Sequence, residues 1–158
     1  MAEFAETLTV QCETRELVNI RAFVEGNARQ CFTDRMVIAK VVMAVDEAVA
    51  NVMEHAYFGR ENGDVSVAVA GNDEAFSVTI TDSGNRFDPS GMPGVDIKDH
   101  VRQGKRDGLG LFIIRKVMDE IKYTFVDDQY NVLRLVKYIN NIGDNAPTGQ
   151  TPGAGNCK

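Results

Sequence analysis

The chain has 158 residues, of which 44% are hydrophobic and 25% are charged, and its net charge at pH 7 is −6. This length and composition suit one globular domain with enough core to fold unaided, and the acidic balance argues against nucleic acid as a direct ligand. No apolar run reaches the roughly 18 residues of a membrane span and the acidic start does not fit a signal peptide, so we expect a cytoplasmic protein without a membrane segment.

Hydrophobic periodicity predicts a strand and two helices in the first third of the chain. Residues Glu6–Cys12 alternate between apolar and polar side chains, which predicts a strand with one buried face. Residues 13 to about 29 carry apolar side chains at helical spacing. Thr33–Tyr57 predicts one long helix, because Thr33 and Asp34 are N-cap residue types and valines recur on one side. The apolar side of this helix should lie on a sheet.

The middle of the chain predicts an antiparallel hairpin followed by a long loop. Asp64–Ala70 and Ala75–Thr81 are rich in β-branched residues and flank the turn signal Gly71-Asn72-Asp73. From Asp82 to Asp107 there is no hydrophobic period, only glycine and proline among polar residues. A loop of this length is uncommon in a compact domain, so we predict a functional lid.

The last part of the chain predicts one helix, two strands and a tail. Leu109–Asp119 has the period of a helix, and Glu120–Val126 and Asn131–Tyr138 read as strands. Residues 141–158 are mostly Gly, Pro, Asn and Thr, with almost nothing to bury. We therefore expect one domain over residues 1–140 and a disordered tail beyond it.

Three polar residues stand near the end of the long predicted helix. Glu47, Asn51 and His55 are each four residues apart, so they lie on one side of the helix. Taken alone, such residues are most often a solvated flank. Their significance depends on the motifs that follow in the chain.

Two further motifs flank the predicted lid. In Asp82-x-Gly84, a carboxylate at a strand end can accept a hydrogen bond from an exocyclic amine, and the glycine lets a flat ring approach, although a simple turn explains the pattern as well. In Gly108-x-Gly110, the amides at a helix start favour a phosphate, although a tight loop-to-helix junction also accounts for the glycines.

In this order and spacing, the three motifs are similar to the N, G1 and G2 boxes of the GHKL (Bergerat-fold) ATPases. The form of the first box, the short lid and the absence of dimerisation or phosphoacceptor domains resemble the anti-sigma-factor serine kinases of bacterial partner-switching systems. The resemblance covers roughly Leu8 to Tyr138. It implies an α+β fold, a two-layer sandwich whose mostly antiparallel sheet is covered on one face by three helices. The boxes read Glu47-x-x-x-Asn51-x-x-x-His55-Ala56-Tyr57, Asp82-x-Gly84 and Gly108-Leu109-Gly110.

The resemblance implies a role for each matching residue. Asn51 would bind Mg²⁺, and Glu47 would act as general base toward a serine hydroxyl on a partner protein. Asp82 would recognise the adenine amino group of ATP, and Gly84 would admit the ring. We expect a structural hydrogen bond rather than a phosphoacceptor role for His55. The remaining predicted contacts to phosphate are Lys105, Arg106, Gly108 and Gly110.

One residue departs from the family pattern. Arg86 stands where the first glycine box usually has its second glycine. Arginine is unfavourable there if the backbone has positive φ or must lie against the nucleotide, but it could instead reach toward phosphate. The sequence leaves both readings of Arg86 open.

Two functions of different class follow from the sequence. The first is an anti-sigma factor that is also a Mg²⁺·ATP-dependent serine/threonine kinase, with a sigma factor and a STAS-type anti-sigma-factor antagonist as partners. The second is a binding module that sequesters a sigma factor or another regulator without phosphotransfer. Glu47 and Asn51 favour the kinase, and Arg86 favours the module. The family resemblance also suggests a homodimer, formed through the N-terminal strand or its surroundings.

Overall fold

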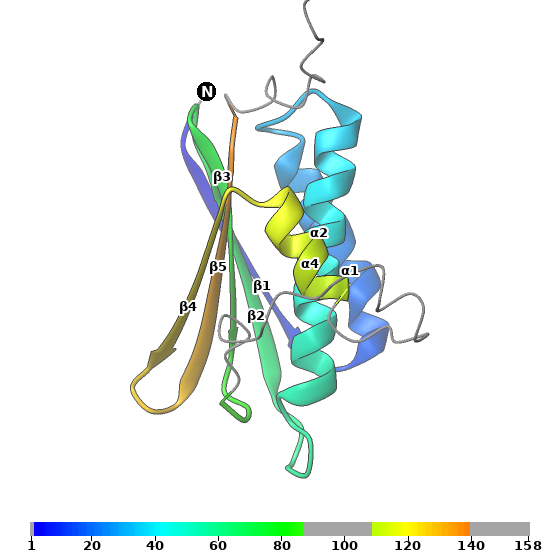
Figure 1. The fold of residues 1–158 in the computed structure, drawn as a ribbon, viewed down its shortest axis with the longest axis vertical. Coiled ribbons are helices and arrows are strands. Elements are labelled where there is room, and N and C mark those ends of the chain that lie inside the picture. Colours follow the sequence, from blue (N-terminus) through cyan, green and yellow to red (C-terminus); the bar gives the residue numbers. More distant parts are fainter. Residues whose placement is uncertain (1, 87–108, 140–158) are drawn as a thin grey trace, which may run out of the picture.

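The computed structural model describes residues 2–86 and 109–139, which form two layers (Figure 1). Helices in the described part of the chain lie against one face of a five-stranded sheet with strand order β1-β2-β3-β5-β4, in which each pairing is antiparallel. The helices are α1 (Leu17–Ala28), α2 (Arg35–His55) and α4 (Leu109–Val117). The strands are β1 (Phe4–Gln11), β2 (Asp64–Gly71), β3 (Ala75–Asp82), β4 (Glu120–Val126) and β5 (Tyr130–Tyr138). The predicted α+β sandwich is confirmed.

The hairpin of β2 and β3 forms the centre of the sheet. Its inward side chains are almost completely buried, and Val67 pairs in register with Ile80. Asn72 closes the turn, because its Oδ1 accepts hydrogen bonds from the backbone N–H groups of Glu74 and Ala75 at 2.8 and 2.9 Å. The alternation read from the sequence therefore identified both the hairpin and its inner face.

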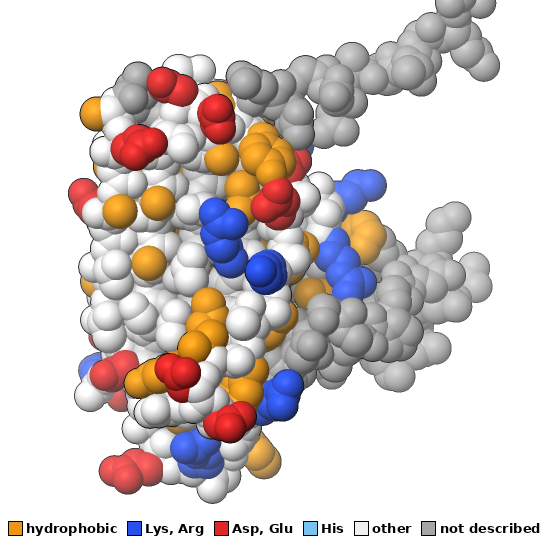
Figure 2. Space-filling model, turned by 90° about the vertical axis from the view of Figure 1, so that its left-hand side faces the viewer, with side chains coloured by type: hydrophobic (Ala, Val, Ile, Leu, Met, Phe, Trp, Pro, Cys, Tyr) orange, Lys and Arg blue, Asp and Glu red, His pale blue; other side chains and the backbone are white. Residues whose placement is uncertain are grey.

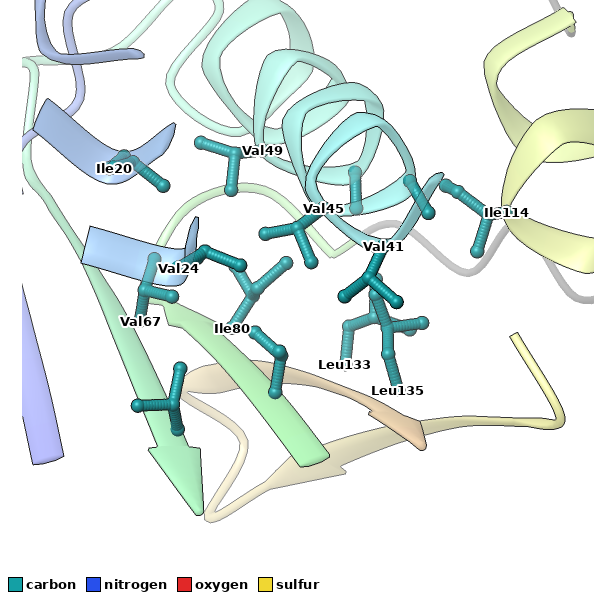
Figure 3. Packing of buried hydrophobic residues seen from close by; sticks show 14 of the residues in the cluster. Ile20, Val24, Val41, Val45, Val49, Val67, Ile80, Ile114, Leu133 and Leu135 are labelled. Atoms are coloured by element: carbon teal, nitrogen blue, oxygen red, sulfur yellow. The ribbon is translucent and has the colours of Figure 1, made fainter. Parts of the chain in front are cut away.

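The core lies between this sheet and the helices (Figure 3). Val41, Val45 and Val49 of α2 point toward the sheet and are at most 1% exposed. Ile114 of α4 points toward α2 and closes the core on that side. Each such side chain contributes about 1.5–3 kcal/mol through burial, so the apolar stripe of α2 holds the two layers together.

The two ends of α2 are fixed by local contacts. At its start, Asp34 is the N-cap, and its carboxylate accepts a hydrogen bond from the backbone N–H of Met36 at 2.8 Å. At its end, Ala56 continues the backbone hydrogen bonding, and Gly59 then reverses the chain with a φ of 74°. The end of α2 thereby comes to rest beside the end of β3.

The first helix differs slightly from the sequence prediction. A single 3₁₀ turn, Thr14–Glu16, precedes α1, and its N-cap Glu13 makes no side-chain capping hydrogen bond. An uncapped first turn commonly tightens into 3₁₀ geometry, because i to i+3 bonds satisfy some of the terminal groups.

The other face of the sheet carries no helix in the described part of the chain (Figure 1). Figure 2 views that side, where polar uncharged side chains and backbone predominate and hydrophobic side chains are scattered. Small residues account for this surface, since Thr7, Ala68 and Thr79 lie side by side across three strands. No helix in residues 2–86 or 109–139 is both long and apolar enough to cross a membrane.

Two sequence predictions fall outside the described residues. Most of the predicted lid is one of them, and it contains Lys105 and Arg106, with Gly108 directly after it. The predicted disordered tail, residues 141–158, is the other. These remain predictions.

Candidate functional site

The end of α2 meets the inner face of the sheet at a small pocket. Polar side chains from α2, from β3 and the residues that follow it, and from β4 and β5 converge there. The structure thus brings together Asn51 and Asp82, which lie 31 positions apart in the chain. The pocket is lined by Asn51, Val52, His55, Ala56, Asp82, Asn85, Tyr123 and Asn131.

Asp82 is a buried carboxylate with one oxygen left available. Only 5% of the residue is exposed, and burial raises the pKa of its carboxyl group. Two hydrogen bonds to Oδ1 oppose that rise, one from the backbone N–H of Gly84 at 2.9 Å and one from Asn131 Nδ2 at 3.0 Å. No hydrogen bond from the described residues reaches Oδ2. A buried acceptor of this kind fits an exocyclic amine such as that of adenine.

Asn131 is a site residue that the sequence analysis missed. It lies opposite Asp82 in the β3–β5 pairing and is 4% exposed. Besides Asp82, its Nδ2 group donates to the carbonyl oxygens of Asn85 at 3.0 Å and Gly84 at 3.4 Å. The signal was present in the sequence, since Asn131 shares the alternating positions of Leu133 and Leu135 and is therefore a polar residue on a buried face.

Gly84 packs directly against the end of α2. A Cβ atom on Gly84 would lie 2.3 Å from the carbonyl oxygen and 2.6 Å from the Cβ atom of Ala56. The next residue fastens the same contact, because the backbone N–H of Asn85 donates to that carbonyl at 2.5 Å and its side chain donates to the carbonyl of Phe58 at 3.0 Å. This packing is enough to require glycine at position 84. Its role in admitting a ring stays a prediction.

Tyr57 ties the same region to the start of β2. Its hydroxyl donates to the carbonyl of Asp64 at 2.8 Å and accepts from the backbone N–H of Ser83 at 3.2 Å. The ring also lies against Gly63, where a Cβ atom would come within 2.6 Å of it. Tyr57 therefore holds the strand end that carries Asp82.

Glu47, a residue of α2, lies beside the start of α4. A Cβ atom on Gly110 would be 2.7 Å from Glu47 Oε2, so the absence of a side chain at position 110 makes room for the carboxylate. Within residues 2–86 and 109–139, the side chain of Glu47 forms no hydrogen bond or ion pair. The helix box and the second glycine box thus meet here, with Asn51 one turn further along α2. Gly108, Lys105 and Arg106 lie outside the described residues.

Arg86 makes a contact that the sequence analysis did not anticipate. Its φ is not in the positive region, so the arginine causes no backbone strain of that kind. Its guanidinium carbon lies 4.7 Å from the centre of the Phe125 ring, a cation–π contact. Phe125 pairs with Asn131 across the β4–β5 hairpin, so Arg86 covers the sheet beside the pocket.

The donor set fits a magnesium ion held mainly by a nucleotide. No cluster of three or more His, Cys, Asp or Glu residues suited to a metal occurs in the described ranges. Asn51 offers one amide oxygen, and Mg²⁺ commonly takes one or two protein ligands with waters and phosphate oxygens completing the shell. The side chain of His55 is 49% exposed, and its Nε2 lies 3.8 Å from Glu54 Oε2. Together these residues could bind a nucleotide and its metal and hold a carboxylate base nearby.

Comparison with known proteins gives one family match and several relatives. The model of the histidine kinase-like ATPase domain matches residues 10–137. Serine-protein kinase RsbW of Listeria monocytogenes serovar 1/2a is 28% identical over an alignment covering 96% of this chain and all of that protein. Serine-protein kinase RsbW of Oceanobacillus iheyensis is 30% identical over 65% of this chain and 66% of its own length. A chain of the SiaB–SiaC complex of Pseudomonas aeruginosa has a similar fold, with a TM-score of 0.59 at 19% identity over 82% of this chain and 88% of that one.

Proposed function

The chain belongs to the histidine kinase-like ATPase domain family, and on that premise we propose that it is a Mg²⁺·ATP-dependent serine/threonine protein kinase and anti-sigma factor. Its substrate would be a serine or threonine on a STAS-type anti-sigma-factor antagonist, and its other partner a sigma factor. Relatives named serine-protein kinase that align over 96% of this chain support the proposal.

The contact between Glu47 and Gly110 is the observation that carries this proposal. A half-buried carboxylate without a partner among the described residues costs desolvation and contributes no hydrogen bond in return. Its carboxylate lies beside Gly110, one of the residues predicted to contact phosphate. A binding module would not require a carboxylate in this position, whereas a kinase requires a base there.

The proposed chemistry assigns one task to each residue. Glu47 would accept the proton of the serine hydroxyl as that oxygen forms a bond to the γ-phosphorus and the bond from phosphorus to the ADP oxygen breaks. Asn51 would hold Mg²⁺, which neutralises charge on the phosphate oxygens when bound. Asp82, kept in place by Asn131 and Gly84, would accept a hydrogen bond from the adenine amino group. Lys105, Arg106, Gly108 and Gly110 are the proposed phosphate contacts.

We also propose a homodimer. The outer edge of β1 pairs with no other strand in the described part of the chain, since β1 ends the strand order. An edge of this kind can pair with a second copy. This supports the N-terminal strand as the region where two copies would meet.

A binding module without phosphotransfer is the second candidate function. Arg86 favours it, because a guanidinium resting on Phe125 covers the sheet beside the pocket where the family usually has glycine. In that case the fold would sequester a sigma factor or another regulator, and nucleotide would be at most structural.

Phosphotransfer from labelled ATP distinguishes the two. Purified protein is incubated with Mg²⁺, γ-labelled ATP and candidate STAS-type antagonists. We expect transfer to one of them and a fall of about 10²-fold or more in Glu47→Gln, with nucleotide binding retained. Glu54→Gln, an exposed carboxylate change on the same helix, is the matched control and should leave transfer unchanged. Undiminished transfer in Glu47→Gln would refute the role of this base, and absence of nucleotide binding by the unaltered protein would leave only the module.

A further inference from the structure

A second hollow, which shares no lining residue with the pocket around Asp82, lies between the first half of α2 and the second half of α4. We call it the α2/α4 groove; it has a volume of about 500 Å³. In Figure 1, α4 lies beside α2, and its last turn is directed toward the end of the helix layer at which α2 begins. Its apolar lining consists of Met36, Val37, Met43, Phe112, Ile113 and Val117.

The apolar lining is more exposed than folding requires. Met36 is 65% exposed and Met43 is 44% exposed, although both stand on a helix whose other side is completely buried. Phe112 and Ile113 are only half-buried, because Ile114 is the residue of α4 that enters the core. Methionine adapts its shape to irregular partners, so two exposed methionines over an apolar hollow are suited to protein binding.

The rim of the groove is basic in a protein whose net charge is −6. Its charged residues are Lys40, Lys116, Lys137 and Asp34. Asp34 is engaged as the cap of α2, and Lys137 lies 3.4 Å from Asp119. Neither Lys40 nor Lys116 forms an ion pair with another described residue. These two lysines thus stand beside apolar surface, and no carboxylate among the described residues is paired with either of them.

The hollow next to this groove has the same character. It lies between α1 and α2, has a volume of about 620 Å³ and shares Met43 with the α2/α4 groove. Its acidic residues are paired, Asp46 with Arg21 and Glu25 with Arg29, at 2.6 and 2.5 Å. Arg35, at the start of α2, forms no ion pair with the described residues. The basic and apolar surface therefore extends across α2 rather than ending at one pocket.

We propose that the α2/α4 groove is a docking site for an acidic amphipathic helix of a partner protein. Apolar side chains of that helix, spaced at i, i+3, i+4 and i+7, would enter the hollow beside Met36 and Met43. Its acidic side chains would meet Lys40 and Lys116, an arrangement of opposite charges that selects the partner and speeds its association. The proposal is independent of the kinase function, because neither lysine belongs to the candidate site.

A library of displayed helices tests this docking site. Leucine is fixed at the apolar positions and the polar positions are randomised between Glu and Lys, and the full-length protein selects binders without nucleotide. We expect Glu-rich helices to be enriched. A synthetic peptide of the enriched sequence should bind at least about 10-fold more weakly to Lys40→Glu/Lys116→Glu. It should bind normally to the control Lys122→Glu/Arg134→Glu, which makes the same charge change on exposed residues of the sheet.

Methyl NMR spectra locate the binding. With methionine methyl groups labelled, the peptide should shift the signals of Met36 and Met43 and leave that of Met53, near the other end of α2, in place. The proposal is overturned if no helix or only Lys-rich helices are enriched, if the two lysine changes have no effect, or if the shifts appear elsewhere. Binding to phosphatidylglycerol vesicles through Lys40 and Lys116, with no peptide selected, would overturn it in favour of a membrane surface.

Discussion

Burying the Asp82 carboxylate lowers the stability of the fold, and the same carboxylate is the acceptor proposed to recognise adenine. Asp82→Asn keeps an oxygen for the hydrogen bonds from Gly84 and Asn131 but replaces the available Oδ2 with an NH₂ donor. Two donors then face each other when the adenine amino group enters. We expect nucleotide affinity to fall roughly 10-fold or more, with the fold retained. Isothermal titration with ATP and circular dichroism check the two parts of this expectation.

Asp82→Asn should also change how the free energy of unfolding depends on pH. Burial raises the pKa of Asp82 above its ordinary value of 3.8, so the folded state holds this proton to a higher pH than the unfolded state does. The stability gained from the protonated form is complete below the unfolded pKa and is lost as pH rises through the folded pKa. Asp82→Asn does not lose this stability as the pH rises, because asparagine does not ionise. Urea unfolding from about pH 4 to 7 should therefore show the free energy of unfolding of Asp82→Asn rising relative to that of the unaltered protein. A relative value that stays constant or falls over this range would contradict the burial of a charge.

Gly84 is expected to be essential for stability. In Gly84→Ala the new Cβ atom would lie 2.3 Å from a backbone carbonyl of Ala56, which cannot move aside as a side chain does. We expect a loss of about 1–3 kcal/mol in the free energy of unfolding. Gly26→Ala in α1 is the control, since nothing lies within 4 Å of its Cβ position and alanine favours the helix by about 0.5–1 kcal/mol. Thermal unfolding should rank Gly26→Ala above the unaltered protein and Gly84→Ala below it; the reverse order would be inconsistent with the packing.

The junction of α2 and α4 allows activity to be separated from stability. In Gly110→Ala the new Cβ atom would lie 2.7 Å from Glu47 Oε2, the far end of a flexible side chain. The carboxylate can turn away at little cost, so stability should change by less than about 0.5 kcal/mol. Phosphotransfer should nevertheless fall by about 10-fold or more, because the proposed base is displaced. Unfolding curves and transfer assays on one preparation test both. Normal transfer with Glu47 displaced in a crystal structure would exclude this carboxylate as the base.

The turn between β4 and β5 is strained at two aspartates. Asp127 and Asp128 have φ values of 54° and 50°, the left-handed region that costs non-glycine residues roughly 1–2 kcal/mol. This pair of values is typical of a type I′ hairpin turn, for which Asn-Gly is preferred. Asp127→Asn/Asp128→Gly should raise the free energy of unfolding by about 1 kcal/mol. Asp73→Gly in the other hairpin, where φ is not positive, should bring no such gain in denaturant titrations. An equal gain from both changes would point to charge rather than backbone as the cause.

The fold of the described residues was largely predictable because local patterns specify it. Alternation in β2 and β3 identified the inner face, and the apolar stripe of α2 identified the side that packs on the sheet. These patterns arise within one element, so one sequence is enough to read them. The 3₁₀ turn before α1 was missed, because helical periodicity does not register a one-turn change of hydrogen bonding.

The candidate site was predictable only in part, because its geometry depends on contacts between distant segments. Asn131 reaches Asp82 only because β5 pairs with β3 in one register, which no local pattern encodes. For the same reason, the contact of Arg86 with Phe125 could not be anticipated. Glu47 and Gly110, which the structure brings together, were singled out through family resemblance rather than through periodicity.

We propose that α2 and the start of α4 hold a nucleotide together with its metal. Calorimetric ATP binding with Mg²⁺ and with EDTA tests it most directly, on the unaltered protein, on Asn51→Ala and on the control Asn19→Ala, an exposed asparagine of α1. We expect Mg²⁺ to strengthen ATP binding in the unaltered protein and in Asn19→Ala, and to have no effect in Asn51→Ala. Equal affinity with and without Mg²⁺ in the unaltered protein, or an Asn51→Ala variant that keeps the full magnesium effect, would contradict the claim.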